Sequence, residues 1–187
     1  MPKRALICGI SGQDGTYLTE LLLGKGYEVT GTSRDAGSTD FRNLTAHGLR
    51  DRVRLVSMNL TDFRSVLQVL TQERPDEIYN LAGQSSVSLS FEQPIDTFDS
   101  VAVAALNLLE AIRFMARPIR LYNACSSECF GDTGDSPANE STAFRPNSPY
   151  ATARATAFWL ECANAHARPR AQAHRGLKKI GVRSRLQ

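Results

Sequence analysis

The chain has 187 residues, of which 42% are apolar and 22% are charged, so it can bury the core of one domain and has little length left for a second. No run approaches the ~18 apolar residues of a membrane span, and the first residues enter a predicted strand without the apolar segment of a signal peptide, so we expect a cytoplasmic protein with no membrane partner. The net charge is +3, but residues 161–187 hold seven Lys and Arg against one acid; the rest of the chain is mildly acidic, and we expect no nucleic-acid partner.

A short apolar strand followed by a glycine turn opens the chain. Residues 5–8 form an apolar run of strand length, and an amphipathic, leucine-rich pattern follows the glycines, which predicts strand, tight turn and helix. Gly9 would permit the turn, Gly12 the approach of a pyrophosphate, and Gly15 close packing of the helix on the strand. Glycines also serve ordinary turns, but this position between strand and helix favours a dinucleotide site. Its predicted residues are Gly9, Ile10, Ser11, Gly12, Gln13, Asp14 and Gly15.

The residues after the second predicted strand, residues 28–32, bear on the choice between NADP and NAD. Ser33, Arg34 and Asp35 follow it, where dinucleotide-binding folds place a group that contacts the adenosine ribose. Arg34 would pair with the 2′-phosphate of NADP, which we favour, whereas Asp35 would serve NAD. Residues 36–52 are polar and read as a connection with a short helix around residues 41–47.

The third predicted strand, residues 53–57, brings further polar groups to the same edge of the sheet. We expect Asn59 and Leu60 to contact an adenine. Asp62 is a candidate for that role too, but we prefer it as the N-cap of the next helix.

The fourth predicted strand, residues 77–83, ends in small residues that leave room for a cofactor beside the backbone. A long helix is predicted from about residue 96 to residue 114, and a fifth strand over residues 119–124. The predicted cofactor contacts after the fourth strand are Leu81, Ala82, Gln84 and Ser85. The predicted buried side of the long helix carries Leu106, Leu108, Leu109 and Ile112.

Candidate catalytic groups follow the fifth strand. Ser126 and Glu128 come directly after it, and Tyr150 and Arg154 lie one turn apart on one helical face. A phenol with an ordinary pKa of about 10 is a poor base at neutral pH, but a fixed cation one turn away favours the phenolate. A Tyr-x-x-x-Arg pair is common on helix surfaces, and only its combination with the glycine turn and an upstream serine favours a catalytic role, in which Tyr150 and Arg154 also contact the cofactor.

The four cysteines give no metal or disulfide pattern. Cys8, Cys125, Cys129 and Cys162 form no C-x-x-C pair, and no histidine stands at zinc-ligand spacing. Reduced structural thiols and no metal site are therefore predicted.

Four segments together resemble the GDP-mannose 4,6-dehydratases, a family of extended short-chain dehydrogenases/reductases. They are residues 9–15, residues 79–85, Ser126-Ser127-Glu128 and residues 145–150, and the likeness runs from about residue 4 to residue 160. The resemblance implies an α/β fold with a Rossmann-type doubly wound parallel sheet, NADP as cofactor, GDP-mannose as substrate, lyase activity and a homo-oligomer.

The resemblance also implies a role for each matched side chain. Tyr150 would take the proton of the sugar's 4-hydroxyl, and Ser126 would hydrogen-bond that hydroxyl. Glu128 would remove the proton on carbon 5 and return it to the departing 6-hydroxyl as water leaves, which separates a dehydratase from related epimerases.

The chain departs from the family pattern in two places. Arg154 stands where the family has a lysine, and because a guanidinium is larger and never donates a proton at working pH, we predict reduced turnover. After residue 160 the sequence becomes rich in Ala and Arg, with Pro169 and Gly176, and the expected substrate segment has no evident counterpart. A shifted reading frame or premature termination is one hypothesis; a basic nucleic-acid or membrane arm is a weaker alternative.

We therefore expect a Rossmann domain over residues 1–160 that lacks most of the C-terminal substrate domain, followed by an atypical basic tail over residues 161–187. Three functions stay open: an active dehydratase, a remnant that binds NADP without turnover, and a related nucleotide-sugar epimerase or reductase.

Overall fold

The computed structural model describes residues 1–134 and 136–167, with side chains up to residue 164. Helices and strands alternate along the chain. The strands are β1 (Arg4–Cys8), β2 (Glu28–Ser33), β3 (Arg54–Ser57), β4 (Glu77–Asn80) and β5 (Arg120–Asn123). The helices are α1 (Gln13–Gly24), α2 (Arg42–Ala46), η1 (Arg50–Arg52), α3 (Phe63–Glu73), α4 (Val87–Glu92), α5 (Pro94–Phe98), η2 (Asp99–Val103), α6 (Ala104–Phe114), η3 (Ser127–Phe130) and α7 (Pro149–Ala167).

Within these residues the strands form one parallel sheet in the order β3-β2-β1-β4-β5. The order reverses at β1, because the chain proceeds from β1 to one edge through β2 and β3 and then crosses to β4 and β5. Such a reversal leaves a crevice at the carboxyl ends of the strands, where ligands bind in doubly wound folds. The predicted α/β fold with a parallel Rossmann-type sheet is confirmed.

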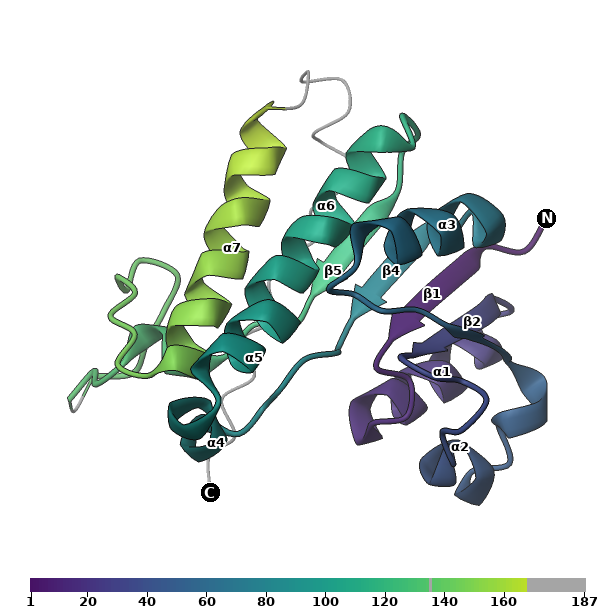
Figure 1. Ribbon diagram of the computed structural model, residues 1–187, viewed down its shortest axis with the longest axis horizontal. Helices are drawn as coiled ribbons and strands as arrows, with labels where there is room; N and C mark the ends of the chain where they lie inside the picture. Colours follow the sequence, from purple (N-terminus) through teal and green to yellow (C-terminus); the bar gives the residue numbers. More distant parts are fainter. Residues whose placement is uncertain (135, 168–187) are drawn as a thin grey trace.

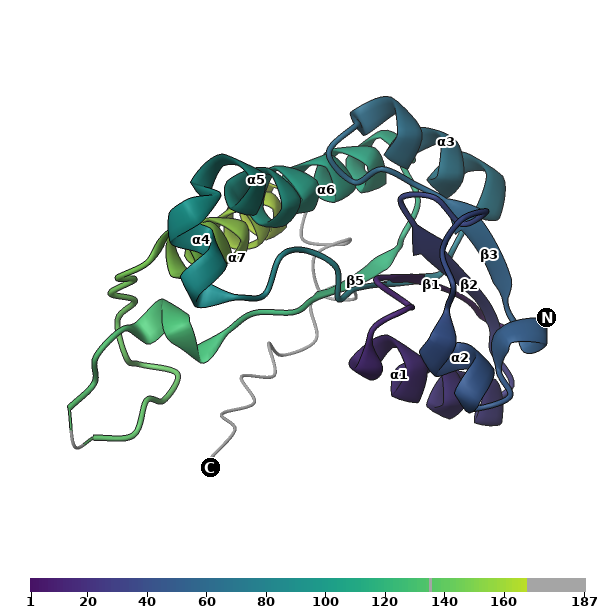
Figure 2. The same ribbon diagram turned by 60° about the horizontal axis from the view of Figure 1, so that its bottom comes forward.

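Helices cover both faces of the sheet. In Figure 2, α3, α6 and α7 lie on one side and α1 and α2 on the other. Alternate residues of β1 supply the two cores, as period-2 side chains require: Leu6 and Cys8 pack with α3 and α6, whereas Ala5 and Ile7 pack with Leu22 of α1 and Leu44 of α2.

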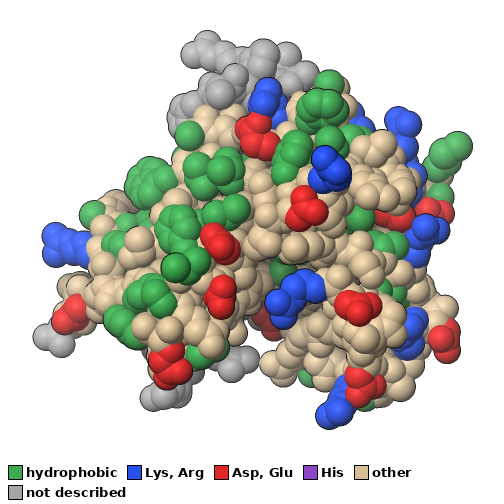
Figure 3. Space-filling model, in the orientation of Figure 1, with side chains coloured by type: hydrophobic (Ala, Val, Ile, Leu, Met, Phe, Trp, Pro, Cys, Tyr) green, Lys and Arg blue, Asp and Glu red, His purple; other side chains and the backbone are tan. Residues whose placement is uncertain are grey.

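Apolar side chains are also exposed on one side of the molecule. Figure 3 shows them gathered over α4, α5, α6 and α7, which lie next to one another in Figure 1. The large exposed ones on these helices are Phe91, Ile95, Phe98, Leu106, Phe114 and Trp159. None of the helices in residues 1–134 and 136–167 combines the length and hydrophobicity that a membrane span requires.

The predicted elements are all present, with differences at their ends and inside one helix. The long helix begins at Pro94 rather than near residue 96, and a π-helical segment, η2, interrupts it. Leu108, Leu109 and Ile112 are buried as predicted, but the prediction for Leu106 is wrong, because this residue is 40% exposed. Asp62 is the N-cap of α3, as preferred, since its carboxylate accepts from the backbone N–H of Arg64 at 2.9 Å.

The expected domain boundary at residue 160 falls inside α7, which continues to Ala167. Residues 168–187 of the expected basic tail lie outside the described part of the chain.

Candidate active site

The turn between β1 and α1 has the backbone geometry that the glycine spacing predicts. Gly9 has a φ of +82°, and a Cβ on it would lie 3.0 Å from the backbone of Leu81 and of Ala82. A Cβ on Gly15 would lie 2.5 Å from the carbonyl oxygen of Gly9. Gly12 is different, because a Cβ there would meet only the Gly9 carbonyl, at 3.4 Å. The fold therefore requires glycine at positions 9 and 15, whereas Gly12 leaves open space on its outer side.

Helix α1 begins without a side-chain cap. Gly12 is its N-cap residue, and the first N–H bonded back to the cap is that of Thr16, at 3.0 Å from the Gly12 carbonyl. The preceding N–H groups, those of Gln13, Asp14 and Gly15, belong to the set that helices leave without an intrahelical partner. With the positive end of the helix dipole, they suit a phosphate.

Two contacts that the sequence did not reveal hold this turn against α2 and β2. The side-chain amide of Asn43, at the start of α2, donates to the carbonyl of Ser11 at 2.9 Å. Ile10 is fully buried, and it packs so closely on β2 that a Cβ on Gly31 would lie 2.2 Å from its Cδ1. Of the predicted cofactor contacts in this turn, Ile10 can therefore offer only its backbone.

The two residues after β2 differ: the Arg34 side chain is exposed, whereas the Asp35 side chain is hydrogen-bonded within its own loop. Arg34 is exposed directly after Ser33. One carboxylate oxygen of Asp35 accepts the backbone N–H groups of Gly37 at 2.9 Å and Ser38 at 3.2 Å, and hydrogen bonds from Ser38 and Gly37 lower the pKa of Asp35. Asp35 thus stabilises its own loop, while Arg34 extends from it.

The predicted adenine contacts after β3 are only partly available. The side-chain oxygen of Asn59, the acceptor that an adenine amine would need, already accepts from the backbone N–H of Thr61 at 3.2 Å and from its hydroxyl at 2.9 Å. Leu60 is half-buried against the core, and its carbonyl accepts from the Asn107 amide at 2.8 Å. The role of this pair stays a prediction.

The segment after β4 continues along the same edge. The Leu81 N–H donates to the Cys8 carbonyl at 3.0 Å, which extends the pairing of β1 with β4. The backbone N–H of Gln84 donates to Ser100 at 3.3 Å and its side-chain amide to the Ser86 carbonyl at 2.7 Å, but its buried Oε1 has no partner. Ala82 is half-buried and Ser85 is exposed.

The start of α7 holds the predicted Tyr150 and Arg154 together. Ser148 caps this helix, since its hydroxyl accepts from the Ala151 N–H at 3.1 Å and Pro149 follows it at the first helical position. Both Tyr150 and Arg154 are buried, at 7% and 6% exposure. The Nε of Arg154 donates to the Tyr150 hydroxyl at 3.3 Å, and its Nη1 donates to the carbonyl of Ala124 at 2.8 Å. A permanent cation is thus hydrogen-bonded to the phenol oxygen and tied to the end of β5.

Ser126 and Glu128 lie next to this pair in the chain segment that follows Ala124. Ser126 caps η3, because its hydroxyl accepts from the Glu128 N–H at 3.3 Å. The Glu128 side chain is exposed and Ser126 is half-buried. The backbone of Arg145 donates to the Cys129 carbonyl at 2.9 Å, and Phe144 lies between Phe130 and Phe158 of α7, at ring-centroid distances of 5.1 and 4.9 Å. These contacts fasten η3 to α7, which brings the four predicted catalytic residues into one region.

A buried polar network beneath this region was not predicted. Asn80 and Asn123, the last residues of β4 and β5, are register partners, and the Asn80 amide donates to the Asn123 oxygen at 2.7 Å. Asn123 also hydrogen-bonds the carboxyl group of Glu161 on α7, whose Oε1 has no partner. Burial raises the pKa of Glu161 to about 7. The network joins the strand ends that carry the two predicted site segments.

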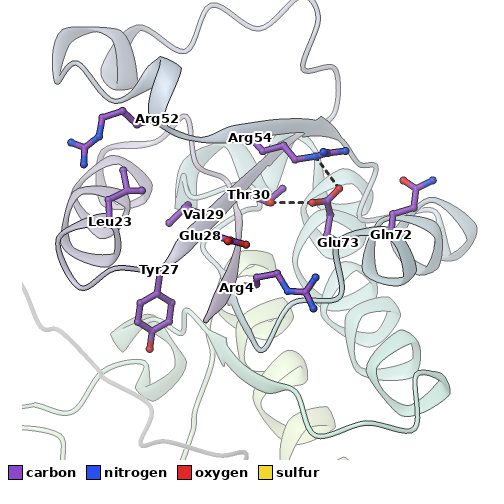
Figure 4. A pocket seen from close by; sticks show the side chains of 10 residues that line it. All are labelled: Arg4, Leu23, Tyr27, Glu28, Val29, Thr30, Arg52, Arg54, Gln72 and Glu73. Carbon is purple, nitrogen blue, oxygen red and sulfur yellow. Dashed lines mark hydrogen bonds and ion pairs between the residues drawn. The ribbon is translucent and has the colours of Figure 1, made fainter. Parts of the chain in front are cut away.

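A hollow of about 740 Å³ lies at the opposite edge of the sheet, at the amino ends of β1, β2 and β3 (Figure 4). Two of its charged side chains pair: Arg54 lies 3.1 Å from Glu73, which also accepts from Thr30 at 3.1 Å. In the described part of the chain, no group of three or more His, Cys, Asp or Glu side chains could hold a metal ion. The carboxyl edge therefore remains the candidate site.

The sheet order, the glycine turn between β1 and α1, and a tyrosine beside a cation define a Rossmann-type α/β protein of the short-chain dehydrogenase/reductase class. Comparison with known proteins narrows this class. Residues 6–171 match the family model described as GDP-mannose 4,6 dehydratase, and the chain belongs to this family.

Individual relatives agree with this family. GDP-mannose 4,6-dehydratase of Vibrio cholerae is 42% identical over 167 residues, covering 86% of this chain and 45% of that protein. GDP-mannose 4,6 dehydratase 2 of Arabidopsis thaliana is 45% identical over 167 residues, covering 84% of this chain and 44% of that protein. The chain thus spans less than half the length of these relatives.

Among solved structures, the fold is similar to that of UDP-glucose 4-epimerase from Thermus thermophilus, determined in complex with NAD. The TM-score is 0.76 at 27% identity, and the match covers 88% of this chain and 51% of the epimerase.

Proposed function

We propose that this chain supplies the cofactor-binding and catalytic half of a GDP-mannose 4,6-dehydratase. The reaction would convert GDP-D-mannose to GDP-4-dehydro-6-deoxy-D-mannose with NADP as cofactor and loss of water. The family match over residues 6–171 and the curated relatives named GDP-mannose 4,6-dehydratase support this proposal.

The residues at the carboxyl edge fit a nicotinamide dinucleotide. The uncapped start of α1 and the open side of Gly12 suit a pyrophosphate. Gln84, whose buried Oε1 has no hydrogen-bond partner, follows β4, the strand that pairs with β1. Exposed Arg34 would pair with a 2′-phosphate, whereas Asp35 already accepts from Gly37 and Ser38, which favours NADP over NAD. A nicotinamide held there would supply the hydride acceptor and donor that an internal oxidation and reduction of the sugar requires.

The proton transfers would fall to the chain's own side chains. Tyr150 would take the proton of the 4-hydroxyl, because the Arg154 N–H that points to its oxygen stabilises negative charge there. Ser126 would hydrogen-bond the same hydroxyl. Glu128, which is exposed next to it, would move the proton from carbon 5 to the departing 6-hydroxyl.

One observation carries the catalytic part of the proposal: Arg154 joins the Tyr150 hydroxyl to the Ala124 carbonyl, two residues before Ser126. A tyrosine on an exposed helix surface would not be hydrogen-bonded, through an arginine, to the end of the strand that precedes Ser126 and Glu128. The pair therefore has the arrangement of a reactive centre.

The test is to incubate the purified chain with GDP-mannose and NADP⁺ and to follow the sugar nucleotide by mass spectrometry. A product that has lost one water supports the proposal. Tyr150→Phe should lower the rate by about 10²- to 10⁴-fold without lowering Tm by more than a few degrees, and Tyr17→Phe, at an exposed position on α1, is the matched control. An unchanged rate in Tyr150→Phe would contradict the assignment.

Two alternatives would give other outcomes in this experiment. A chain that binds NADP without turnover would show cofactor binding by fluorescence but no product. A related epimerase or reductase is favoured by the similarity to the Thermus thermophilus epimerase, and it would yield a changed sugar that keeps its 6-hydroxyl. Cytoplasmic location and a homo-oligomer stay predictions.

A further inference from the structure

Two cysteines flank the proposed catalytic segment at close range. The Sγ atoms of Cys125 and Cys129 lie 3.7 Å apart, and the three residues between them include Ser126 and Glu128. We propose that Cys125 and Cys129 form a redox-active dithiol, which a hydroperoxide closes to a disulfide, and that closure displaces Ser126 and Glu128. The sequence alone indicated structural thiols, because these cysteines form no C-x-x-C pair.

The geometry brings the sulfur atoms most of the way to a bond. A disulfide has an S–S distance of about 2.0 Å, so the two atoms would have to approach by roughly 1.7 Å. The intervening residues form a single short 3-10 turn, held by the Cys129 N–H on the Ser126 carbonyl at 3.2 Å and the Glu128 N–H on the Ser126 hydroxyl at 3.3 Å. Such a turn has no long hydrogen-bond ladder to resist contraction.

The two thiols differ in a way that assigns their roles. Cys125 is half-buried, whereas Cys129 is fully buried. The hydrogen-bond contact with Cys129 lowers the pKa of Cys125 against the opposing effect of burial, and the Arg154 cation acts in the same direction. The pKa of Cys129 is raised by its contact with Cys125 and by burial. Cys125 is therefore the attacking thiolate and Cys129 the resolving thiol.

The chemistry balances with one oxidant. The Cys125 thiolate attacks the peroxide oxygen, the O–O bond breaks, and a sulfenic acid and hydroxide form. The Cys129 sulfur then attacks the sulfenic sulfur, the S–O bond breaks, and the Cys129 proton leaves with the hydroxyl as water. The two thiols together lose two electrons, which the hydroperoxide takes up.

Closure would reach the proposed site through two contacts. Cys129 Sγ lies 3.8 Å from the carbonyl of Ala151, the residue after Tyr150, and the Ser126 hydroxyl caps the turn that would contract. Movement of Cys129 toward Cys125 therefore shifts Ser126 and Glu128 relative to Tyr150. This consequence rests on the proposed function, whereas the disulfide itself does not.

The sequence offers a clean assay for the bond. Trypsin cleaves after Arg120 and does not cleave between Arg145 and Pro146, so one peptide, residues 121–154, contains Cys125 and Cys129 and no other cysteine. The full chain is treated with stoichiometric hydrogen peroxide, its remaining thiols are alkylated, and it is digested. We expect this peptide to lack both alkyl groups and to weigh about 2 Da less than the reduced form, with recovery after dithiothreitol.

Variants separate the two steps. Cys129→Ala should leave a sulfenic acid on Cys125 that dimedone traps, whereas Cys125→Ala should leave Cys129 reduced at the same peroxide dose. Cys8→Ala, at a buried position on β1, is the control and should leave the disulfide unchanged. Alkylation of both cysteines after peroxide treatment of the wild-type chain, or a disulfide between different peptides, would overturn the dithiol.

Measuring dehydration before and after oxidation separates the dithiol proposal from the proposed function. We expect oxidation to lower dehydration of GDP-mannose on the order of 10²-fold, the loss that a displacement of about 1 Å can cause, with recovery on reduction and no effect in Cys129→Ala. Equal turnover of the reduced and disulfide forms would overturn the displacement. If the disulfide forms but the reduced chain makes no product, the dithiol stands and the proposed function fails.

Discussion

Arg154 uses its guanidinium in a way that bears on its fitness for the proposed reaction. Its Nε reaches the Tyr150 hydroxyl and its Nη1 reaches the Ala124 carbonyl. The guanidinium is thereby held at the end of β5, and two of its N–H groups donate to partners inside the protein. We therefore expect the predicted contact of Arg154 with the cofactor to be weakened and its stabilisation of negative charge on the phenol to be kept.

Arg154→Lys should accordingly raise dehydratase turnover, by about tenfold if proton relay contributes at the low end of acid–base catalysis. An ammonium on a flexible stem can release and rebind a proton, which a guanidinium cannot. Initial rates of product formation at saturating cofactor test this expectation. Arg113→Lys, on the exposed end of α6, controls for the substitution itself, and a turnover equal to or below that of the wild-type chain would count against the prediction.

Glu161 gives the folded chain a specific dependence on pH. Burial raises its pKa from 4.5 to about 7, although the hydrogen bond from Asn123 opposes the shift. The folded state thus holds this proton more tightly than the unfolded state. The stabilisation that results is fully present below about pH 4.5 and is lost as pH rises through about 7.

Glu161→Gln should remove that dependence. Compared with the wild-type chain, the variant should have a similar free energy of unfolding at pH 4.5 and a higher one at pH 8, by as much as about 3 kcal/mol. Urea denaturation at both pH values measures the difference, with Glu20→Gln on the exposed side of α1 as the control. The same difference at both pH values would show that Glu161 does not titrate in this range.

At the scale of elements, the turn between β1 and α1 contains one glycine that folding requires, Gly15, and one that we expect cofactor binding to require, Gly12. A Cβ on Gly15 would lie 2.5 Å from the Gly9 carbonyl and 2.7 Å from the Ile10 Cα, which are backbone atoms that cannot rotate away. A Cβ on Gly12 would make only one contact, at 3.4 Å, but would stand where a pyrophosphate would approach.

Gly15→Ala should therefore cost about 1–3 kcal/mol of stability, or very roughly 2–12 °C in Tm at this chain length. Gly12→Ala should leave Tm nearly unchanged and weaken NADP⁺ binding on the order of tenfold, which corresponds to 1.4 kcal/mol. Thermal denaturation and cofactor titration by fluorescence measure both effects. Gly24→Ala, where no atom lies within 4 Å of the added Cβ, is the control, and a Gly12→Ala chain that unfolds early would refute the distinction.

The element order was predictable because apolar periodicity and glycine positions are local signals. The same signals could not predict η2, since a π turn differs from an α turn by one residue in a hydrogen bond and leaves the apolar pattern almost intact. Leu106 was misplaced for another reason: successive residues of an α-helix are about 100° apart, so Leu106 and the buried Leu108 lie on opposite sides of α6. The Asn80–Asn123 pair and the Asn43–Ser11 contact join residues 43 and 32 positions apart, which no local pattern encodes.

The candidate site was predictable in its residue types but not in its internal contacts. Tyr150 and Arg154 were placed together by their spacing of one helical turn, and the structure adds that the pair reaches β5 through Ala124. Glu161, by contrast, was assigned to an atypical tail because the sequence after residue 160 changes composition. Its burial follows from the continuation of α7 to Ala167 and its position beside Asn123.

At the scale of the whole molecule, the carboxyl edge of the sheet gathers segments from distant parts of the sequence. The turn after β1, the loop containing Arg34 after β2, the loop containing Asn59 after β3 and the segment containing Gln84 after β4 all meet there, because the strands are parallel. A ligand that spans these loops links both sides of the strand reversal, so it should stabilise the folded chain as a unit.

The final prediction uses this linkage to identify the cofactor. At a concentration of 100 times its Kd, NADP⁺ should add about 2.7 kcal/mol to the free energy of unfolding, which raises Tm by very roughly 5–10 °C. NAD⁺ at the same concentration should raise it less, because exposed Arg34 has no phosphate to pair with and Asp35 already accepts two backbone N–H groups. Arg34→Ala should bring the NADP⁺ shift down to the NAD⁺ value, while Arg64→Ala, on the exposed first turn of α3, should leave both shifts unchanged. Equal shifts for the two cofactors in the wild-type chain would show that Arg34 does not read the 2′-phosphate.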